Sequence, residues 1–178
     1  MKRKAVIMDE NNMKRAVARI TYEILERNKG TQDLCVIGIF SRGVALARRI
    51  ADKISELENE KIPCGALDIT AFRDDRKTVS DADRTNIDFD VNNKNVVIVD
   101  DVFYTGRTTR AAIDAIMERG RPQSVQLAVL IDRGHRELPI RPDYVGKNLP
   151  TSREECVKVS VSETDGSDSV AIYSAQEE

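Results

Sequence analysis

Three apolar runs constrain the fold of this chain more than any other feature. They cover residues 34–40, 96–99 and 125–131. A continuous apolar run is typical of a strand that is buried on both faces of a parallel sheet. Before and between these runs, apolar residues recur with helical spacing, from a start near 9–12 to a stop at Gly30 and over about 44–57 and 107–119. Buried strands that alternate with helices predict an α/β domain with a mainly parallel central sheet flanked by helices.

The rest of the chain adds shorter strands and one long polar segment. Further strands are predicted at 63–72, 157–161 and 170–173, and residues 132–156 are expected to be irregular. Residues 73–90 are polar and lack periodicity, which is typical of a functional loop in a compact domain. Because we find no repeat and no linker, residues 1–178 are predicted to form a single domain.

Composition excludes several classes of protein. No apolar stretch approaches the length of a membrane span, and residues 5–8 are too short for the core of a signal peptide. Three widely spaced cysteines exclude a disulfide framework, and one histidine excludes a histidine-cluster metal site. We therefore expect a cytoplasmic protein.

Charge is distributed unevenly along the chain. The formal net charge is −2, yet residues 1–30 hold 8 basic and 4 acidic residues, and residues 151–178 hold 2 basic and 7 acidic residues. One interpretation is solvated faces with an acidic tail. The other is a local basic surface for an anionic partner, and residue totals do not choose between them.

The most informative motif is the strand–turn–helix at 96–109. An apolar strand ends at Asp100 and Asp101, and a small turn rich in hydroxyl groups leads into a helix. Helix N-terminal N–H groups, a close-approaching Gly106 and threonine hydroxyls suit a phosphate, while paired carboxylates suit the vicinal hydroxyls of a ribose. The predicted ligand is a sugar 5′-phosphate. Ordinary helix capping is the alternative, and the motifs of P-loop and dinucleotide-binding proteins are absent from the sequence.

This run resembles the signature of type I phosphoribosyltransferases, which bind 5-phosphoribosyl-1-pyrophosphate (PRPP). Residues 132–141 and 143–148, with 5–7 and 72–75, resemble more narrowly the bifunctional pyrimidine-operon regulators that are also uracil phosphoribosyltransferases. The resemblance covers essentially the whole chain. It implies the type I phosphoribosyltransferase fold, with a small hood formed by about 132–156 plus the chain termini, and a flexible active-site loop.

The resemblance also assigns roles to residues of this chain. It implies catalytic roles for Arg42, Asp100 and Asp101, and a base-binding role for Tyr144 and Val145. Plain packing is the alternative for Tyr144. The implied PRPP- and UMP-binding residues are Ser41, Arg42, Gly43, Asp100, Asp101, Val102, Phe103, Tyr104, Thr105, Gly106, Arg107, Thr108 and Thr109. The implied flexible-loop residues are Arg73, Asp74, Asp75 and Arg84, whose charges are otherwise merely solvated.

The implied reaction converts uracil and PRPP into UMP and pyrophosphate. Its transition state resembles an oxocarbenium ion, so the protein has to stabilise the leaving pyrophosphate through Arg42, the loop and Mg²⁺. Mg²⁺ is expected to be held mainly by PRPP and water, with no direct protein ligand. The family sometimes assigns a proton relay to the second carboxylate, here Asp101.

The resemblance implies a second function, the UMP-dependent binding of a messenger RNA stem-loop that attenuates transcription of pyrimidine biosynthesis genes. The implied RNA-binding residues are Arg15, Arg19, Arg27, Arg141 and Lys147, on a surface shared across a homodimer or higher homo-oligomer. Tyr22 stands where relatives often carry histidine. The alternative to RNA binding is that these basic side chains are simply exposed to solvent. Two other functions stay open, a salvage enzyme without RNA binding and a PRPP sensor without catalysis.

Overall fold

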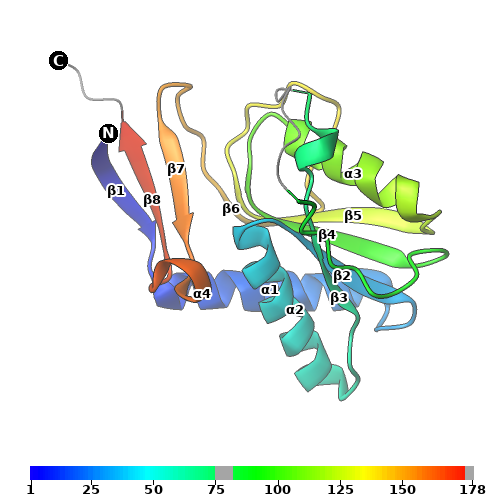
Figure 1. Ribbon diagram of the computed structural model, residues 1–178. Helices are drawn as coiled ribbons and strands as arrows, with labels where there is room; N and C mark the ends of the chain where they lie inside the picture. The colour runs from blue at the N-terminus through cyan, green and yellow to red at the C-terminus, as the bar shows by residue number, and fades with distance from the viewer. Residues whose placement is uncertain (75–81, 175–178) are drawn as a thin grey trace.

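The structure, a computed structural model, describes residues 1–74 and 82–174, and it is built on a five-stranded parallel sheet (Figure 1). Every pair of neighbours in this central sheet runs parallel. The strands in spatial order are β3 (Cys64–Leu67), β2 (Leu34–Ile39), β4 (Asn95–Phe103), β5 (Ser124–Asp132) and β6 (Tyr144–Asn148). The α/β fold with a mainly parallel sheet is therefore confirmed.

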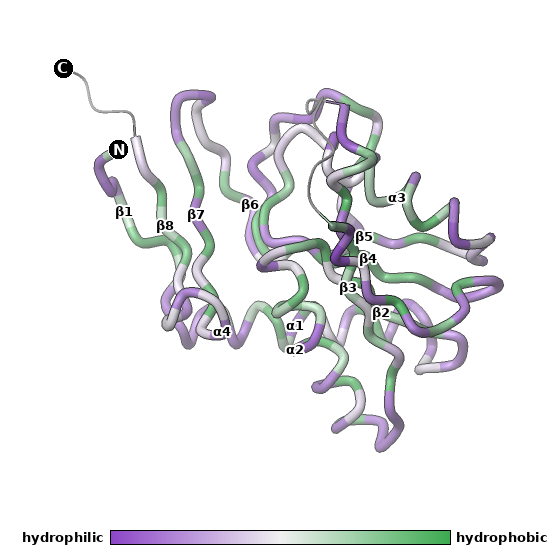
Figure 2. The backbone as a smooth tube through the Cα atoms, viewed as in Figure 1, coloured by the Kyte–Doolittle hydropathy of each residue, from purple (hydrophilic) through white to green (hydrophobic). Residues whose placement is uncertain are grey.

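Helices cover both faces of the central sheet, which explains the continuous apolar runs. Helices α1 (Glu10–Asn28) and α2 (Arg42–Glu58) pack on one face, and α3 (Arg107–Arg119) packs on the other. Along β2, Val36 contributes to the cluster with α1 and α2, and its neighbour Ile37 contributes to the cluster with α3. Figure 2 shows the same pattern as hydrophobic strands between hydrophilic connections.

A smaller antiparallel sheet forms the hood at one end of the molecule. Its order is β1 (Lys2–Met8), β8 (Ser169–Ser174) and β7 (Cys156–Ser160), and the short helix α4 (Ser162–Asp165) connects β7 to β8. Arg49 of α2 ties this hood to the core through Glu163 (2.6 Å) and Asp168 (2.7 Å). The hood thus contains the N-terminal strand and the last described strand of the chain.

The structure differs from the sequence-based prediction in several segments, and the short helix α4 was not predicted. The strand predicted at 63–72 ends at Leu67, because the Asp68 carboxylate accepts hydrogen bonds from the Thr70 N–H and hydroxyl and shapes a short 3-10 helix, η1 (Thr70–Phe72). Strand β6 lies inside the segment predicted to be irregular, so part of the predicted hood belongs to the central sheet. Strand β1 was not predicted.

The remaining features of the described chain agree with the sequence analysis. Asp9 caps α1 by accepting a hydrogen bond from the Asn12 N–H, and Lys29 ends the helix in a left-handed conformation. The three cysteines are free thiols. None of the described helices combines the length and apolar character needed to cross a bilayer.

Candidate active site

The site begins where β4 leaves the core. The strand continues through Asp100 and Asp101 to Phe103, and a short turn leads into α3. Gly106 occupies the N-cap of α3 with φ of 93°, a backbone conformation that side chains other than glycine rarely adopt. The free N–H groups of the first turn of α3 are therefore presented next to the carboxyl end of β4, where they suit an anion.

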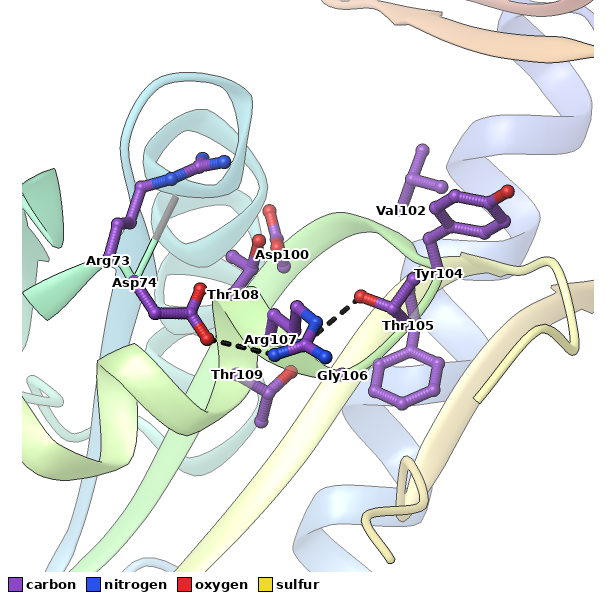
Figure 3. Close-up of a pocket in the computed structure, with 11 residues that line it drawn as sticks. Arg73, Asp74, Asp100, Val102, Tyr104, Thr105, Gly106, Arg107, Thr108 and Thr109 are labelled. Atoms are coloured by element: carbon purple, nitrogen blue, oxygen red, sulfur yellow. Dashed lines mark hydrogen bonds and ion pairs between the residues drawn. The ribbon is translucent and has the colours of Figure 1, made fainter. Parts of the chain in front are cut away.

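A cavity of about 200 Å³ lies over this turn (Figure 3). Its walls combine carboxylate, hydroxyl and guanidinium groups with backbone N–H groups. The lining residues are Arg73, Asp74, Asp100, Val102, Phe103, Tyr104, Thr105, Gly106, Arg107, Thr108 and Thr109. The structure thus brings together the whole predicted turn and two residues of the predicted flexible loop.

A second cavity of about 390 Å³ adjoins the first and shares Asp100, Val102, Arg73 and Thr108 with it. The second cavity adds residues from three further segments of the chain, so it extends the site toward β2 and β3. These residues are Ile39, Phe40, Ser41, Asp68, Ile69, Thr70, Arg84 and Asp101. Together the two cavities form one elongated site along the carboxyl edge of the central sheet, where ligands of open parallel sheets bind.

The two adjacent carboxylates differ in environment. Asp100 is 9% exposed, and its Oδ1 accepts a hydrogen bond from the Asp101 N–H (2.9 Å). Burial, together with the negative charge of Asp101, raises the pKa of Asp100 well above its usual range. A ligand that supplies hydroxyl donors or positive charge, such as a ribose or a hydrated cation, would offset the cost of ionising both carboxylates.

Close backbone contacts place the start of α2 beside this pair. A Cβ atom added to Gly43 would lie 2.5 Å from the Val99 carbonyl oxygen, directly before Asp100. Only glycine permits this close approach of the two backbones. Ser41, two residues before Gly43, lines the second cavity. The peptide bond between Phe40 and Ser41 is cis.

Arg42 takes a different position from its neighbours. Its guanidinium donates two hydrogen bonds to Asp165 of α4 (3.0 and 2.9 Å), and Arg42 lines neither cavity. The hydrogen bonds to Asp165 raise the pKa of Arg42 above its ordinary value. The predicted catalytic arginine is therefore beside the site but bound to the hood.

Asp68 is a site residue that the sequence analysis missed. It is buried at the carboxyl end of β3, where Arg84 forms an ion pair with it (2.9 Å). Burial alone would raise the pKa of Asp68, but hydrogen bonds from Thr70 and Arg84 lower it to about 2. The signal that could have found it is the one used for Asp100, an acidic residue directly after a buried strand.

The turn between β4 and α3, residues 103–107, is called here the phosphate turn after its predicted ligand, and one predicted flexible-loop residue, Asp74, contacts it. The Asp74 carboxylate pairs with Arg107 (2.8 Å) (Figure 3). Arg107 also pairs with Glu137 (3.1 Å). The Arg84 guanidinium lies 4.6 Å from the centre of the Phe40 ring. Asp75 lies outside the described residues.

Tyr144 and Val145 do not occupy the position implied for base-contacting residues. Tyr144 begins β6 opposite Ala128, whereas the carboxyl edge lies four residues further on, at the pair of Asn148 and Asp132. The Tyr144 side chain is buried, and its hydroxyl donates to Gln126 (2.6 Å). Neither residue lines the two cavities, and packing explains the Tyr144 side chain, so the implied base-contacting role stays a prediction.

The predicted RNA-binding residues lie on a different face. A groove of about 430 Å³, called here the basic groove, runs between β1, α1 and β6 and is lined by Ile7, Met8, Asn12, Arg15, Ala16, Arg19, Gly146 and Lys147. Arg19 donates hydrogen bonds to the carbonyl oxygens of Val145 (3.1 Å) and Gly146. Outside the groove lining, Arg27 pairs with Asp143 (2.6 Å), and Arg141 and Tyr22 are exposed.

Comparisons with known proteins agree with this geometry. The phosphoribosyl transferase domain family matches residues 6–164. Solved structures with the same fold include a hypoxanthine-guanine phosphoribosyltransferase from Bacillus anthracis (TM-score 0.72, 19% identity, covering 96% of this chain and 98% of that one) and the hypoxanthine phosphoribosyltransferase of Trypanosoma cruzi (TM-score 0.72, 17% identity, covering 98% of both).

Much closer relatives share a single name, "Bifunctional protein PyrR". The protein of Caldicellulosiruptor bescii is 59% identical over 169 residues, which cover 93% of both chains. The protein of Deinococcus radiodurans is 52% identical over 177 residues, which cover 98% of this chain and 97% of that one. The chain therefore belongs to the phosphoribosyltransferase domain family and, within it, to the PyrR family of bifunctional proteins.

Proposed function

We propose that this chain transfers the phosphoribosyl group of PRPP to uracil and also binds messenger RNA as a UMP-dependent attenuator of pyrimidine biosynthesis genes. The observation that carries the enzymatic part is the elongated site at the carboxyl edge of β4. It joins a helix N-terminus with threonine hydroxyls to a pair of adjacent carboxylates. The regulatory part rests on membership of the PyrR family and on the basic groove.

The first cavity suits the 5′-phosphate of the substrate. Backbone N–H groups at the start of α3 and the hydroxyls of Thr105, Thr108 and Thr109 supply hydrogen-bond donors to its oxygens. Asp100 and Asp101 accept hydrogen bonds from the ribose hydroxyls. This arrangement fixes C1 of the ribose between the phosphate turn and the second cavity.

The bond change occurs at C1 of the ribose. N1 of uracil forms a bond to C1, the bond from C1 to the pyrophosphate oxygen breaks, and the proton of N1 is released. Positive groups stabilise the charge on the departing pyrophosphate. Ser41 lines the second cavity where this group leaves, and Arg42 joins it once its guanidinium exchanges Asp165 for a phosphate oxygen.

The donor set of the site is compatible with Mg²⁺. Adjacent carboxylates fit a hydrated Mg²⁺, which binds through few protein ligands and keeps several waters. No group of three acidic, cysteine or histidine side chains suited to a metal occurs among the described residues. Asp100 and Asp101 would hold the hydrated ion together with substrate oxygens. When bound, Mg²⁺ would neutralise charge on the pyrophosphate.

A turnover assay tests the enzymatic part. The full-length chain, incubated with PRPP, Mg²⁺ and uracil, should form UMP and pyrophosphate in equal amounts. Hypoxanthine and guanine replace uracil in parallel reactions. Formation of a nucleotide only from a purine base would establish a salvage enzyme of different specificity, and no turnover with any base would reject the enzymatic proposal.

Binding measurements test the regulatory part. The protein should bind a stem-loop from a pyrimidine operon leader more tightly in the presence of UMP, and an RNA of the same length with scrambled sequence should not respond to UMP. Equal affinity for both RNAs would reject sequence-specific regulation. The proposal assigns the chain to the cytoplasm as a homodimer or larger homo-oligomer, and sedimentation measurements give its size.

A further inference from the structure

Arg133 lies at the point where the phosphate turn, strand β5 and the hood meet. It directly follows β5, and its backbone N–H donates to the Phe103 carbonyl oxygen (3.0 Å), which extends the β4–β5 ladder by one residue. The residue is 8% exposed. Its main chain is therefore fixed to the end of β4, directly before the phosphate turn.

The Arg133 side chain reaches the segment that connects the central sheet to the hood. Its guanidinium donates to the Thr151 hydroxyl (2.9 Å) and to the carbonyl oxygens of Ser152 (3.2 Å) and Glu155 (2.6 Å). All three acceptors lie between β6 and β7. One side chain thus fixes both ends of a five-residue stretch through neutral oxygen atoms.

Tyr104 of the phosphate turn covers the same guanidinium. The carbon at the centre of the guanidinium lies 4.0 Å from the ring centre, in the geometry of a cation–π contact. The His135 ring meets Tyr104 edge-on, with 5.2 Å between centres, and its Nε2 contacts the Thr151 carbonyl oxygen. Figure 3 shows the Tyr104 ring extending to the side of the cavity opposite Arg73 and Asp74.

We propose that Arg133 is a positioning residue that holds the segment 151–155 at a fixed distance from the phosphate turn and thereby shapes the slot for the base. This inference rests on the proposed function, because it concerns the base that joins C1 of the ribose. Because the departing pyrophosphate takes the second cavity, on the side of β2 and β3, the base of the same ligand is left the opposite side, toward the end of β5 and the hood connection. Arg133 acts through Tyr104 and Thr151, and it does not touch the reacting atoms.

The burial of Arg133 supports a positioning role over a role in surface charge. A buried guanidinium is costly unless its donors are satisfied, and here Nε and Nη2 of Arg133 both donate to the hood connection. Lysine at this position keeps the charge but cannot bond Thr151, Ser152 and Glu155 together, because its ammonium lacks the planar fork of donors. Arginine is therefore required by geometry as well as by charge.

The test compares the affinities of two ligands that differ only in the base end, UMP and ribose 5-phosphate, by isothermal titration calorimetry. Arg133→Lys should bind UMP about tenfold more weakly and ribose 5-phosphate within about twofold of the wild type, since only the base slot is disturbed. In turnover, KM for uracil should rise while KM for PRPP stays within about twofold. Arg153→Lys, an exposed position in the same segment, is the matched control and should match the wild type.

Two further outcomes complete the test. If Arg133→Lys does not fold, Thr151→Val replaces it, because valine keeps the shape of threonine and removes only the hydroxyl that Arg133 binds. Equal losses for UMP and ribose 5-phosphate, or no loss for either, in the folded variant would overturn the inference. If the wild type binds UMP and ribose 5-phosphate with equal affinity, both the inference and the proposed function are overturned. If the ratio of the two affinities is the same in the variant as in the wild type, only the inference is overturned.

Discussion

The carboxylates at the carboxyl edge of the central sheet and the cations of the basic groove differ in how far they are exposed. At the edge, Asp100 and Asp68 are buried, and their protonation depends on neighbours within hydrogen-bond distance. In the groove, Arg15, Arg19 and Lys147 are exposed. The contrast shows that a few buried charges can define a ligand site, whereas the strength of an exposed cationic surface depends on how many side chains remain available to a partner.

Fewer of the predicted RNA-binding side chains are available to a partner than the sequence indicates. Arg19 is bound to two main-chain carbonyl oxygens and Arg27 to Asp143. Arg15 and Lys147 form no hydrogen bond or ion pair with the part of the chain that the structure describes, so they retain their full capacity for phosphate contacts. The predictions below probe the edge first, where the largest effects are expected, and then the groove.

Asp101→Asn should give the largest effect. The change keeps the shape of the side chain and removes one charge beside Asp100, so kcat/KM for PRPP should fall about 100-fold, while the thermal midpoint changes little. Asp114→Asn, on the exposed face of α3, should retain wild-type activity. Steady-state kinetics decide the matter, and full activity of Asp101→Asn would remove this carboxylate from the mechanism.

Gly43→Ala should disturb the edge through shape alone. The added Cβ would lie 2.5 Å from the Val99 carbonyl oxygen, so the free energy of unfolding should fall by about 2–3 kcal/mol. Gly134→Ala is the comparison, because nothing lies within 4 Å of its added Cβ and only its positive φ of 78° opposes the change, at a cost of about 1 kcal/mol. Urea denaturation measures both. Equal costs would show that the contact with Val99 relaxes freely.

Asp68→Asn tests the buried charge at the other end of the edge. The pKa of Asp68 is lowered to about 2 from 3.8, so its ionised form stabilises the fold above about pH 4, and this contribution is lost as the pH falls toward 2. At pH 6, the free energy of unfolding of the wild type should exceed that of the variant by about 2 kcal/mol. The difference should shrink between pH 4 and pH 2. A difference that does not change with pH would contradict the assignment.

Arg15→Gln and Lys147→Gln should give the smallest effects, and these should appear only in RNA binding. Each change should weaken RNA binding about threefold to tenfold. It should also reduce the slope of the logarithm of the binding constant against the logarithm of the salt concentration by about one. Arg121→Gln, exposed on the connection between α3 and β5, is the control. Filter binding at several salt concentrations measures the slope, and an unchanged slope in both variants would place the RNA on another face.

The fold could be predicted wherever local pattern and burial coincide. Residues 34–40, 96–99 and, apart from Gln126, 125–131 are apolar because both faces of the sheet are covered. Asp9 caps α1 through a bond to a residue three positions away. Strands β1 and β6 could not be predicted. Five residues of β1 are exposed and β6 ends in lysine and asparagine, so distant pairing partners hold these strands rather than their own periodicity.

The same distinction applies to the site. The phosphate turn is contiguous in sequence, so its residues could be predicted together. The ion pair of Arg42 with Asp165 joins residues 123 positions apart, and Arg133 reaches Glu155 across 22 positions, so neither contact is visible in a local motif. Tyr144 was assigned by resemblance alone, and its strand register moves it away from the edge.

The pairing of β1 with β8 has a consequence for the order in which the molecule assembles. Residues 2–8 find their partners only at residues 170–174, so the hood closes the longest loop in the chain. During synthesis, the core strands β2, β4 and β5 can pair while β1 is still unpaired, because its partner β8 has not yet been made. We therefore expect the hood to fold last, because the loop-closure entropy of the β1–β8 pairing is most easily offset once the core has formed.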